Sequence, residues 1–284
     1  MPARENPTAR QVRLGAELRK LRDAAGKTAR EAAGHLSTDQ AKISHIEAGK
    51  IGVSEERIRR LAAFYGGADE TLLDALCAIA REHRGQYWWD EYRNVLAPGF
   101  LDIAELEHHA TALRTMHSVT LPGVFQTEEY ARAVCSGHIP TLSADELNIR
   151  VAHRMRRRGI LERTDPPPFE AIIHEAALRM RFGGRQVARA QLEALIEATD
   201  RPGVAIRVIP FTCEDFIEAT QSVLYAAGPV PELDTIRIDS VLGGLFLGAR
   251  MELKRYGALL DNAVAASLDM TESRHLIHHI AREL

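Results

Sequence analysis

The chain has 284 residues, of which 45% are hydrophobic and 26% charged, and its formal net charge is −3. This composition is that of an ordinary soluble globular protein with room for two domains. Three widely separated cysteines, no apolar run of bilayer length and no apolar leader argue against a disulfide framework, a membrane span and secretion, and they favour the cytoplasm.

Charge is distributed unevenly along the chain. Residues 1–84 hold 15 lysines and arginines against 12 aspartates and glutamates, whereas the remainder holds 21 against 27. A mildly basic first part on an acidic body is typical of a small DNA-contacting module joined to a larger domain. We therefore predict a flexible arm at 1–9, whose Arg4 could touch phosphate, a first domain at 10–84 and a second at 85–284.

The first domain is predicted to be a bundle of five short helices. Apolar residues recur every three or four positions through 10–25, which indicates a helix with one buried face. Gly26 ends that helix, and Thr28 with Glu31 three residues later has the spacing of a capping box for a second helix. Further helices are expected at 39–48, 54–65 and 69–84.

The stretch STDQAKISHIEAGK at 37–50 has the properties of a helix that reads DNA. Thr38 or Asp39 can cap it, and Ile43 and Ile46 fall three apart, so both point inward. The other edge carries hydrogen-bond donors, namely Gln40, Lys42, Ser44 and His45. A short helix with one apolar and one donor-rich edge suits the DNA major groove.

These segments resemble the Cro/cI-type helix-turn-helix family, also called the xenobiotic-response-element (XRE) family. The matching segments are LGAELRKLRDAAGKT, REAAGHLSTDQAKIS and, most specifically, ISHIEAGK. The resemblance implies an ion pair between Arg22 and Glu47 that ties the first helix to the recognition helix. Proteins of this kind generally dimerise, so we expect a homodimer that reads a two-half-site operator through the helix at 39–48.

The chain departs from the family pattern at two positions. Ser37 occupies the turn between the second and third helices, where glycine is common and where serine needs a strained or adjusted backbone. Ala29 occupies the start of the second helix, where a glutamine often braces phosphate or a base. Neither departure removes the fold, but both alter the expected DNA contacts.

The second domain is predicted to combine helices with a small β-sheet, which makes the whole chain mainly α with a smaller α+β part. Residues 85–100 form a connector that holds both tryptophans. Helices are expected at 103–116, from 127, and at 145–161, 186–198, 251–268 and 273–283. Strands are expected at 169–174, 204–210, 219–226, 235–241 and 245–249, the last two hinged at 243–244.

This second part is similar to the C-terminal domain of WhiJ-like actinobacterial regulators. The similarity is carried by LPGVFQTEEYARA, the basic RMRRR segment, IIHEAALR, QLEAL and VAIRVIP, in that order. Val124 and Phe125 replace the two leucines that are usual there. The resemblance implies a regulator that acts with a small acidic protein encoded nearby, so an antitoxin-like interaction module that sequesters such a partner is the alternative function.

Double-stranded DNA is the best-supported partner. Gln40 could pair with an adenine edge, and Lys42 or His45 could donate to guanine or phosphate. The candidate DNA contacts are Thr28, Thr38, Gln40, Ala41, Lys42, His45 and Lys50, with Arg22 and Glu47 as scaffold. The competing interpretation is that these are solvated residues on the surface of a helical bundle.

Other chemistry has weaker support. The basic run Arg154, Arg156, Arg157 and Arg158 is better interpreted as a solvated or ion-paired helix face than as a phosphate patch or a landing strip for an acidic partner. The histidines at 275, 278 and 279 and the pair at 108–109 lack the further ligand that a metal site needs. No catalytic motif occurs, so we expect no enzyme activity, cofactor or metal.

Overall fold

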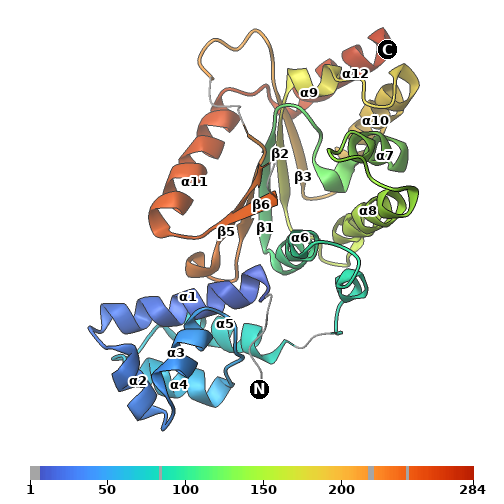
Figure 1. Ribbon diagram of the computed structural model, residues 1–284. Helices are drawn as coiled ribbons and strands as arrows, with labels where there is room; N and C mark the ends of the chain where they lie inside the picture. The colour runs from blue at the N-terminus through green and yellow to red at the C-terminus, as the bar shows by residue number, and fades with distance from the viewer. Residues whose placement is uncertain (1–6, 83–84, 217–220, 241–242) are drawn as a thin grey trace. The chain divides into compact units, whose positions relative to one another are not determined.

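The computed structural model describes residues 7–82, 85–216, 221–240 and 243–284 (Figure 1). The chain forms two compact units, Met1–Leu106 with Gly228–Asp234, and Glu107–Ala227 with Thr235–Leu284. Arg4 and most of the predicted arm lie outside the described residues, as do the ends of the predicted helix at 69–84 and of the predicted strands at 219–226 and 235–241.

The first unit begins with the five-helix bundle expected from the sequence. Its helices are α1 (Ala9–Ala24), α2 (Ala29–His35), α3 (Gln40–Glu47), α4 (Glu55–Phe64) and α5 (Glu70–Arg81). Side-chain caps fix where several of them start: Thr28 and Glu31 form the predicted capping box, and Ser54 accepts a hydrogen bond from the backbone N–H of Arg57. Leu18, Ile58 and Leu76 are at most 1% exposed and lie at the centre of the core.

The turn between α2 and α3 confirms the expectation for Ser37. Its φ is +51°, and among the described residues it is the only one other than glycine that has a positive φ. This left-handed conformation lets Thr38 N–H donate to the carbonyl of Ala33 at 2.9 Å and so redirects the chain into α3. A serine here stores backbone strain that a glycine would relieve.

An aromatic segment follows the bundle. The 3₁₀ helix η1 (Trp88–Tyr92) leads into α6 (Pro98–His109). Trp89 is 2% exposed and its ring stacks on Tyr87 with the centroids 4.6 Å apart. Because both tryptophans of the chain lie in the first unit, tryptophan fluorescence reports the unfolding of that unit.

Glu105 makes the stability of the first unit depend on pH. It is 8% exposed on α6, and burial raises its pKa to about 7, although a hydrogen bond from Thr8 acts in the opposite direction. In the unfolded chain a glutamate titrates near 4.5. The folded state therefore holds the proton more firmly between these values, so this contribution to stability is present below pH 4.5 and is lost as the pH rises to 7.

Glu105→Gln keeps the shape of the side chain and removes the titration. We expect it to raise the free energy of unfolding at pH 8 by about 1–3 kcal/mol and to flatten the dependence between pH 5 and 8. Urea unfolding followed by tryptophan fluorescence at both pH values measures this. Glu56→Gln, at a side chain 78% exposed on α4, serves as the control. An unchanged pH profile in Glu105→Gln contradicts the assignment.

The second unit is built on a six-stranded sheet in the order β3-β2-β1-β4-β5-β6. β1, β2 and β3 run parallel, and β4, β5 and β6 continue the sheet antiparallel. The strands are β1 (Ala112–His117), β2 (Phe169–His174), β3 (Val204–Ile209), β4 (Val223–Ala227), β5 (Thr235–Ser240) and β6 (Gly243–Leu247).

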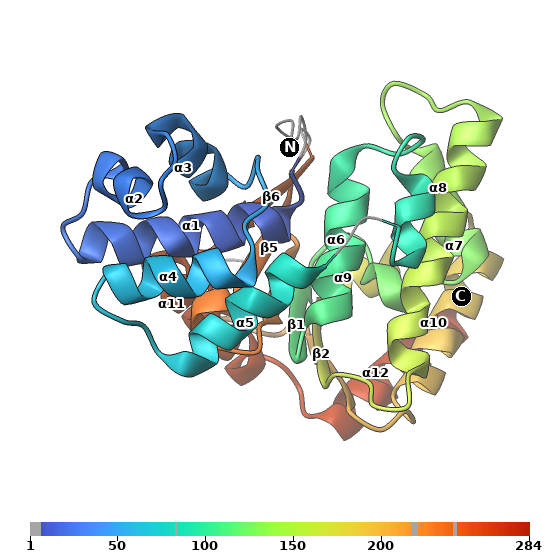
Figure 2. The same cartoon turned by 90° about the horizontal axis from the view of Figure 1, so that it is seen from below.

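Helices cover both faces of this sheet (Figures 1 and 2). α11 (Arg250–Ala265) packs Leu260 and Ala263 against Met116, Ile172 and Ile236 on one face. The other face carries Phe169, whose ring packs edge-on against that of Phe125 with the ring centroids 5.0 Å apart. The helices of the unit besides α11 are α7 (Glu128–Ser136), α8 (Ala144–Arg157), α9 (Glu175–Arg179), α10 (Arg185–Ala198) and α12 (Met270–Glu283).

The central strand β1 corrects the sequence prediction. The expected helix at 103–116 ends at His109, and its second half is a strand between β2 and β4. Leu113 and Met116 are three apart, which fits a helix, but both are 1% exposed because both faces of the strand are covered. Thr115 is equally buried, and its hydroxyl donates to the carbonyl of Val223 at 2.7 Å.

Two smaller differences concern helix ends. The predicted helix at 145–161 stops at Arg157, and residues Arg158–Glu162 form the 3₁₀ helix η3. The short helix α9, directly after β2, was not predicted. The chain connects β1 to β2 through α7 and α8, and β2 to β3 through α9 and α10, which is the helical crossover that parallel neighbours require.

Candidate nucleic-acid interface

α3 presents the amphipathic face that the sequence predicts. Asp39 caps it by accepting a hydrogen bond from the backbone N–H of Lys42 at 2.7 Å. Ile43 and Ile46 are each 1% exposed and pack into the bundle. Gly49 ends the segment in the left-handed region with φ +72°. The opposite edge of the helix is therefore free to face a duplex.

The candidate contacts lie along this edge and beside it. Gln40, Ala41 and Lys50 are exposed, whereas Lys42 and His45 are half-buried along the same helix. Thr38, in the turn before α3, is also half-buried. Ser44 is exposed, but its hydroxyl donates to the carbonyl of Gln40 at 3.1 Å within the helix. The structure thus brings six of the seven candidates together on α3 and its two ends.

Thr28 is placed differently from the other candidates. It is exposed at the start of α2, but its backbone N–H and its hydroxyl both donate to Glu31 Oε2, at 2.8 and 2.7 Å. These bonds also lower the pKa of Glu31 and keep it ionised. Contact between Thr28 and phosphate requires this carboxylate to move away.

Arg22 and Glu47 form the ion pair that the resemblance implies. Arg22 Nε lies 2.6 Å from Glu47 Oε1, and Nη2 lies 3.0 Å from Oε2, which is a two-point geometry. Arg22 Nη1 donates to the carbonyl of Lys27 at 2.8 Å. The side chains are 10% and 9% exposed, and the hydrogen bond with Glu47 raises the pKa of Arg22. One guanidinium therefore joins α1, the turn into α2 and the end of α3.

Gly15 fixes the position of α3 as well, and the sequence prediction did not assign it a role. A Cβ built at Gly15 would lie 2.5 Å from the carbonyl oxygens of Ile46 and Glu47. Because glycine has no side chain, the backbone of α1 can cross the end of α3 in direct contact with its backbone. Gly49 makes the reciprocal contact, because its Cβ would lie 2.8 Å from the backbone of Gln11. The available signal was a glycine inside a helical pattern, which weakens a helix unless packing requires it.

A surface pocket lies next to the ion pair. The residues that line it are Arg19, Arg22, Ala29, Ser44, Glu47 and Ala48. Ala29 is the first residue of α2, and its small side chain lies at this pocket beside the end of α3.

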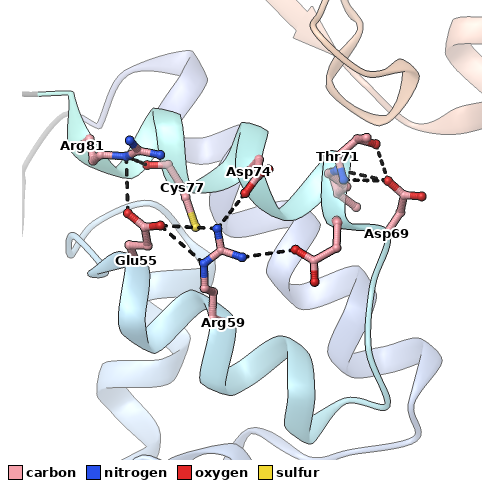
Figure 3. Close-up of polar contacts among 9 residues, drawn as sticks. Glu55, Arg59, Asp69, Thr71, Asp74, Cys77 and Arg81 are labelled. Carbon is pink, nitrogen blue, oxygen red and sulfur yellow. Dashed lines mark hydrogen bonds and ion pairs between the residues drawn. The ribbon is translucent and has the colours of Figure 1, made fainter.

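Arg59 on α4 organises a second charged network of the first unit (Figure 3). Its guanidinium lies 2.6 Å from Asp74, 3.3 Å from Glu70 and 3.4 Å from Glu55. These side chains are 40–78% exposed, so the network contributes little to stability compared with the buried pair on α3.

The described residues do not form a metal-binding cluster, and the histidines and cysteines considered from the sequence lie as follows. Among those residues no group of three or more potential ligands could hold a metal ion. His279 pairs with Glu283 on its own helix at 3.1 Å. Cys77 and Cys135 are buried and Cys213 is half-buried, all three as free thiols. Among the described residues, no helix is both long enough and apolar enough to cross a bilayer.

Comparison with known protein families gives two matches, one in the N-terminal part of the chain and one in the rest. Residues 13–76 match a family model described as a helix-turn-helix domain. Residues 100–279 match a model described as "Domain of unknown function (DUF5753)". No curated protein and no solved structure matches the chain.

The first match contains α2, α3 and the ion pair, and a helix-turn-helix domain indicates a DNA-binding regulator. The second match spans more than half of the chain and includes every strand of the six-stranded sheet. The chain therefore belongs to the family defined by the domain of unknown function DUF5753, here preceded by a helix-turn-helix domain.

Proposed function

We propose that the protein is a cytoplasmic, sequence-specific transcription regulator that binds its operator as a homodimer. The observation that carries the proposal is the exposed polar edge of α3, held by the Arg22–Glu47 pair inside a matched helix-turn-helix domain. A single short helix reads few base pairs, so two copies on two half-sites about one helical turn apart give the required specificity.

The chemistry of α3 suggests how bases are read. Gln40 can form two hydrogen bonds with an adenine edge, and the methyl group of Ala41 can contact a thymine methyl. Lys42 and His45 can donate to guanine, whereas Lys50 and Thr38, at the ends of the helix, can donate to phosphates. We assign the domain to the Cro/cI type because ISHIEAGK carries the glutamate that pairs with Arg22.

Gln40→Ala tests the assignment. An operator is first selected from random duplexes with the wild-type protein, and affinities are then measured by fluorescence anisotropy at fixed salt. We expect Gln40→Ala and His45→Ala to weaken operator binding about 5- to 150-fold, which corresponds to about 1–3 kcal/mol per base contact, and to leave non-specific binding nearly unchanged. Gln186→Ala, at an exposed glutamine on α10, is the matched control.

Two results would count against this function. One is an unchanged sequence preference in both variants while the protein remains folded. The other is a stoichiometry of one chain per selected operator, measured by sedimentation of the complex, which would remove the homodimer.

The second candidate is the antitoxin-like module that sequesters a small acidic protein encoded nearby, as the similarity to WhiJ-like regulators implies. The size of the DUF5753 domain, more than half of the chain, favours it. The test is co-purification of the full-length protein with the neighbouring gene product. If no partner is retained, this candidate function is removed, and the proposed DNA-binding function is unaffected. Nothing in either candidate calls for catalysis, and we propose that the protein is not an enzyme.

A further inference from the structure

Three arginines of the second unit lie close enough to interact electrostatically, since the charge of Arg157 acts on both Arg154 and Arg237. Arg154 and Arg157 are three residues apart on α8, so they share a face of the helix, and Arg237 lies on β5. Arg157 binds the carboxylate of Glu107 through two bonds of 2.8 and 2.5 Å. We call these three guanidinium groups, with His117 at the end of β1, the arginine cluster.

The other two arginines bind their partners less strongly than Arg157 binds Glu107, because one partner is neutral and the other is exposed. Arg154 Nη1 donates to the neutral amide oxygen of Gln126 at 2.9 Å, and Gln126 is itself fixed by donating to the carbonyl of Leu121 at 2.7 Å. Arg237 Nη1 lies 2.5 Å from Asp239 Oδ1, but that carboxylate is 53% exposed. Arg237 Nε is buried and has no hydrogen-bond partner among the described residues.

Glycines make room for these guanidinium groups. A Cβ at Gly123 would lie 3.1 Å from Arg157 Nη1, and one at Gly244 would lie 2.6 Å from Arg237 Nε. His117 stands beside them with its Nδ1 3.3 Å from Ser222 Oγ. The backbone thus approaches the cluster closely from the 3₁₀ helix η2 (Gly123–Phe125) and from β6.

The cluster carries more positive charge than its described neighbours neutralise. Three arginines face two carboxylates, Glu107 and Asp239. Burial lowers the pKa of both Arg154 and Arg237, and the positive charge of Arg157 lowers each further. Burial also lowers the pKa of His117 to about 4, so this ring is neutral at pH 7 and can accept or donate a hydrogen bond without adding charge.

Buried guanidinium groups in excess over carboxylates are costly unless an anion joins them. Guanidinium groups bind carboxylate and phosphate oxygens through paired hydrogen bonds, which makes arginine the preferred residue for such ligands. We propose that the arginine cluster is a binding site for a small molecule that carries a phosphate or carboxylate group. This site lies within the DUF5753 domain, and the proposal does not depend on DNA binding by the first unit.

The test uses the full-length protein with inorganic phosphate and succinate as separate probes. Thermal unfolding is followed by circular dichroism, which reports both units, and by tryptophan fluorescence, which reports the first unit. The midpoint for the second unit is measured with increasing concentrations of each probe, in place of chloride at constant ionic strength. We expect a saturable rise in the midpoint with at least one probe, since a ligand that binds only the folded state stabilises it. The responding probe identifies the anionic group.

Variants locate the binding. Arg154→Gln and Arg237→Gln are expected to weaken the response at least tenfold in probe concentration, whereas Arg158→Gln, in the same basic run but outside the cluster, retains it. Arg154→Gln is also expected not to lower the midpoint in chloride, because it removes an excess charge; a purely structural arginine would lower it. The proposal is overturned by no saturable response in the wild type, or by an equal response in all three variants.

Discussion

Gly15→Ala is expected to lower the free energy of unfolding of the first unit by about 2 kcal/mol, the net of a steric cost and a smaller gain in helix propensity. The new Cβ would lie 2.5 Å from the carbonyl oxygens of Ile46 and Glu47, and these backbone atoms cannot move without shifting the end of α3. Overpacking of this kind typically costs about 1–3 kcal/mol or more, which outweighs the gain of about 1 kcal/mol that alanine brings to a helix interior.

The matched control for this change is Gly34→Ala in α2. No atom lies within 4 Å of a Cβ built there, so only the helix propensity changes and stability should rise by up to about 1 kcal/mol. Urea unfolding followed by tryptophan fluorescence measures both variants. If Gly15→Ala is as stable as Gly34→Ala, α1 does not hold the recognition helix by this contact.

Glu47→Ala is expected to destabilise the first unit by about 3–5 kcal/mol, the usual effect of removing one partner from a buried ion pair. Among the described residues, the partners that would remain to Arg22, whose side chain is 10% exposed, are the carbonyl of Lys27 and the more exposed carboxylate of Asp23. Because Glu47 is the last residue of α3, its loss should also weaken operator binding in whatever fraction stays folded.

Two further variants make this prediction specific. Asp74→Ala breaks the exposed pair with Arg59 and should change stability by less than about 1 kcal/mol. Replacing both partners, Arg22→Met with Glu47→Leu, should recover part of the loss, since no buried charge is then left unpaired. Equal effects of Glu47→Ala and Asp74→Ala would show that the buried pair has no special role.

Local signals in the sequence predict much of the first unit. Each cap there has its partner within three residues, so Thr28 and Ser54 are predicted from the local sequence, and Asp39 is one of the two caps that the sequence allows for α3. The Arg22–Glu47 pair joins residues 25 positions apart, and only the resemblance to a known family pointed to it.

Features that depend on distant chain segments could not be predicted in this way. β1 is covered on both faces, so its residues show no alternation, and their spacing fits a helix equally well. The contact at Gly15 requires knowledge of which backbone crosses it. The arginine cluster joins α8 to β5, about 80 residues later. The basic run is interpreted from the sequence as solvated or ion-paired; Arg157 is ion-paired with Glu107, whereas the hydrogen bond of Arg154 to Gln126 depends on a distant segment.

The central claim is that the polar edge of α3 contacts bases, and site-specific photo-cross-linking to the selected operator tests it most directly. A photoreactive residue replaces Ala41 on α3 in one protein and the exposed Glu56 on α4 in another. The predicted result is cross-linking from position 41 to bases within each half-site and none from position 56. Cross-linking from position 56, or a stable complex with none from position 41, would contradict it.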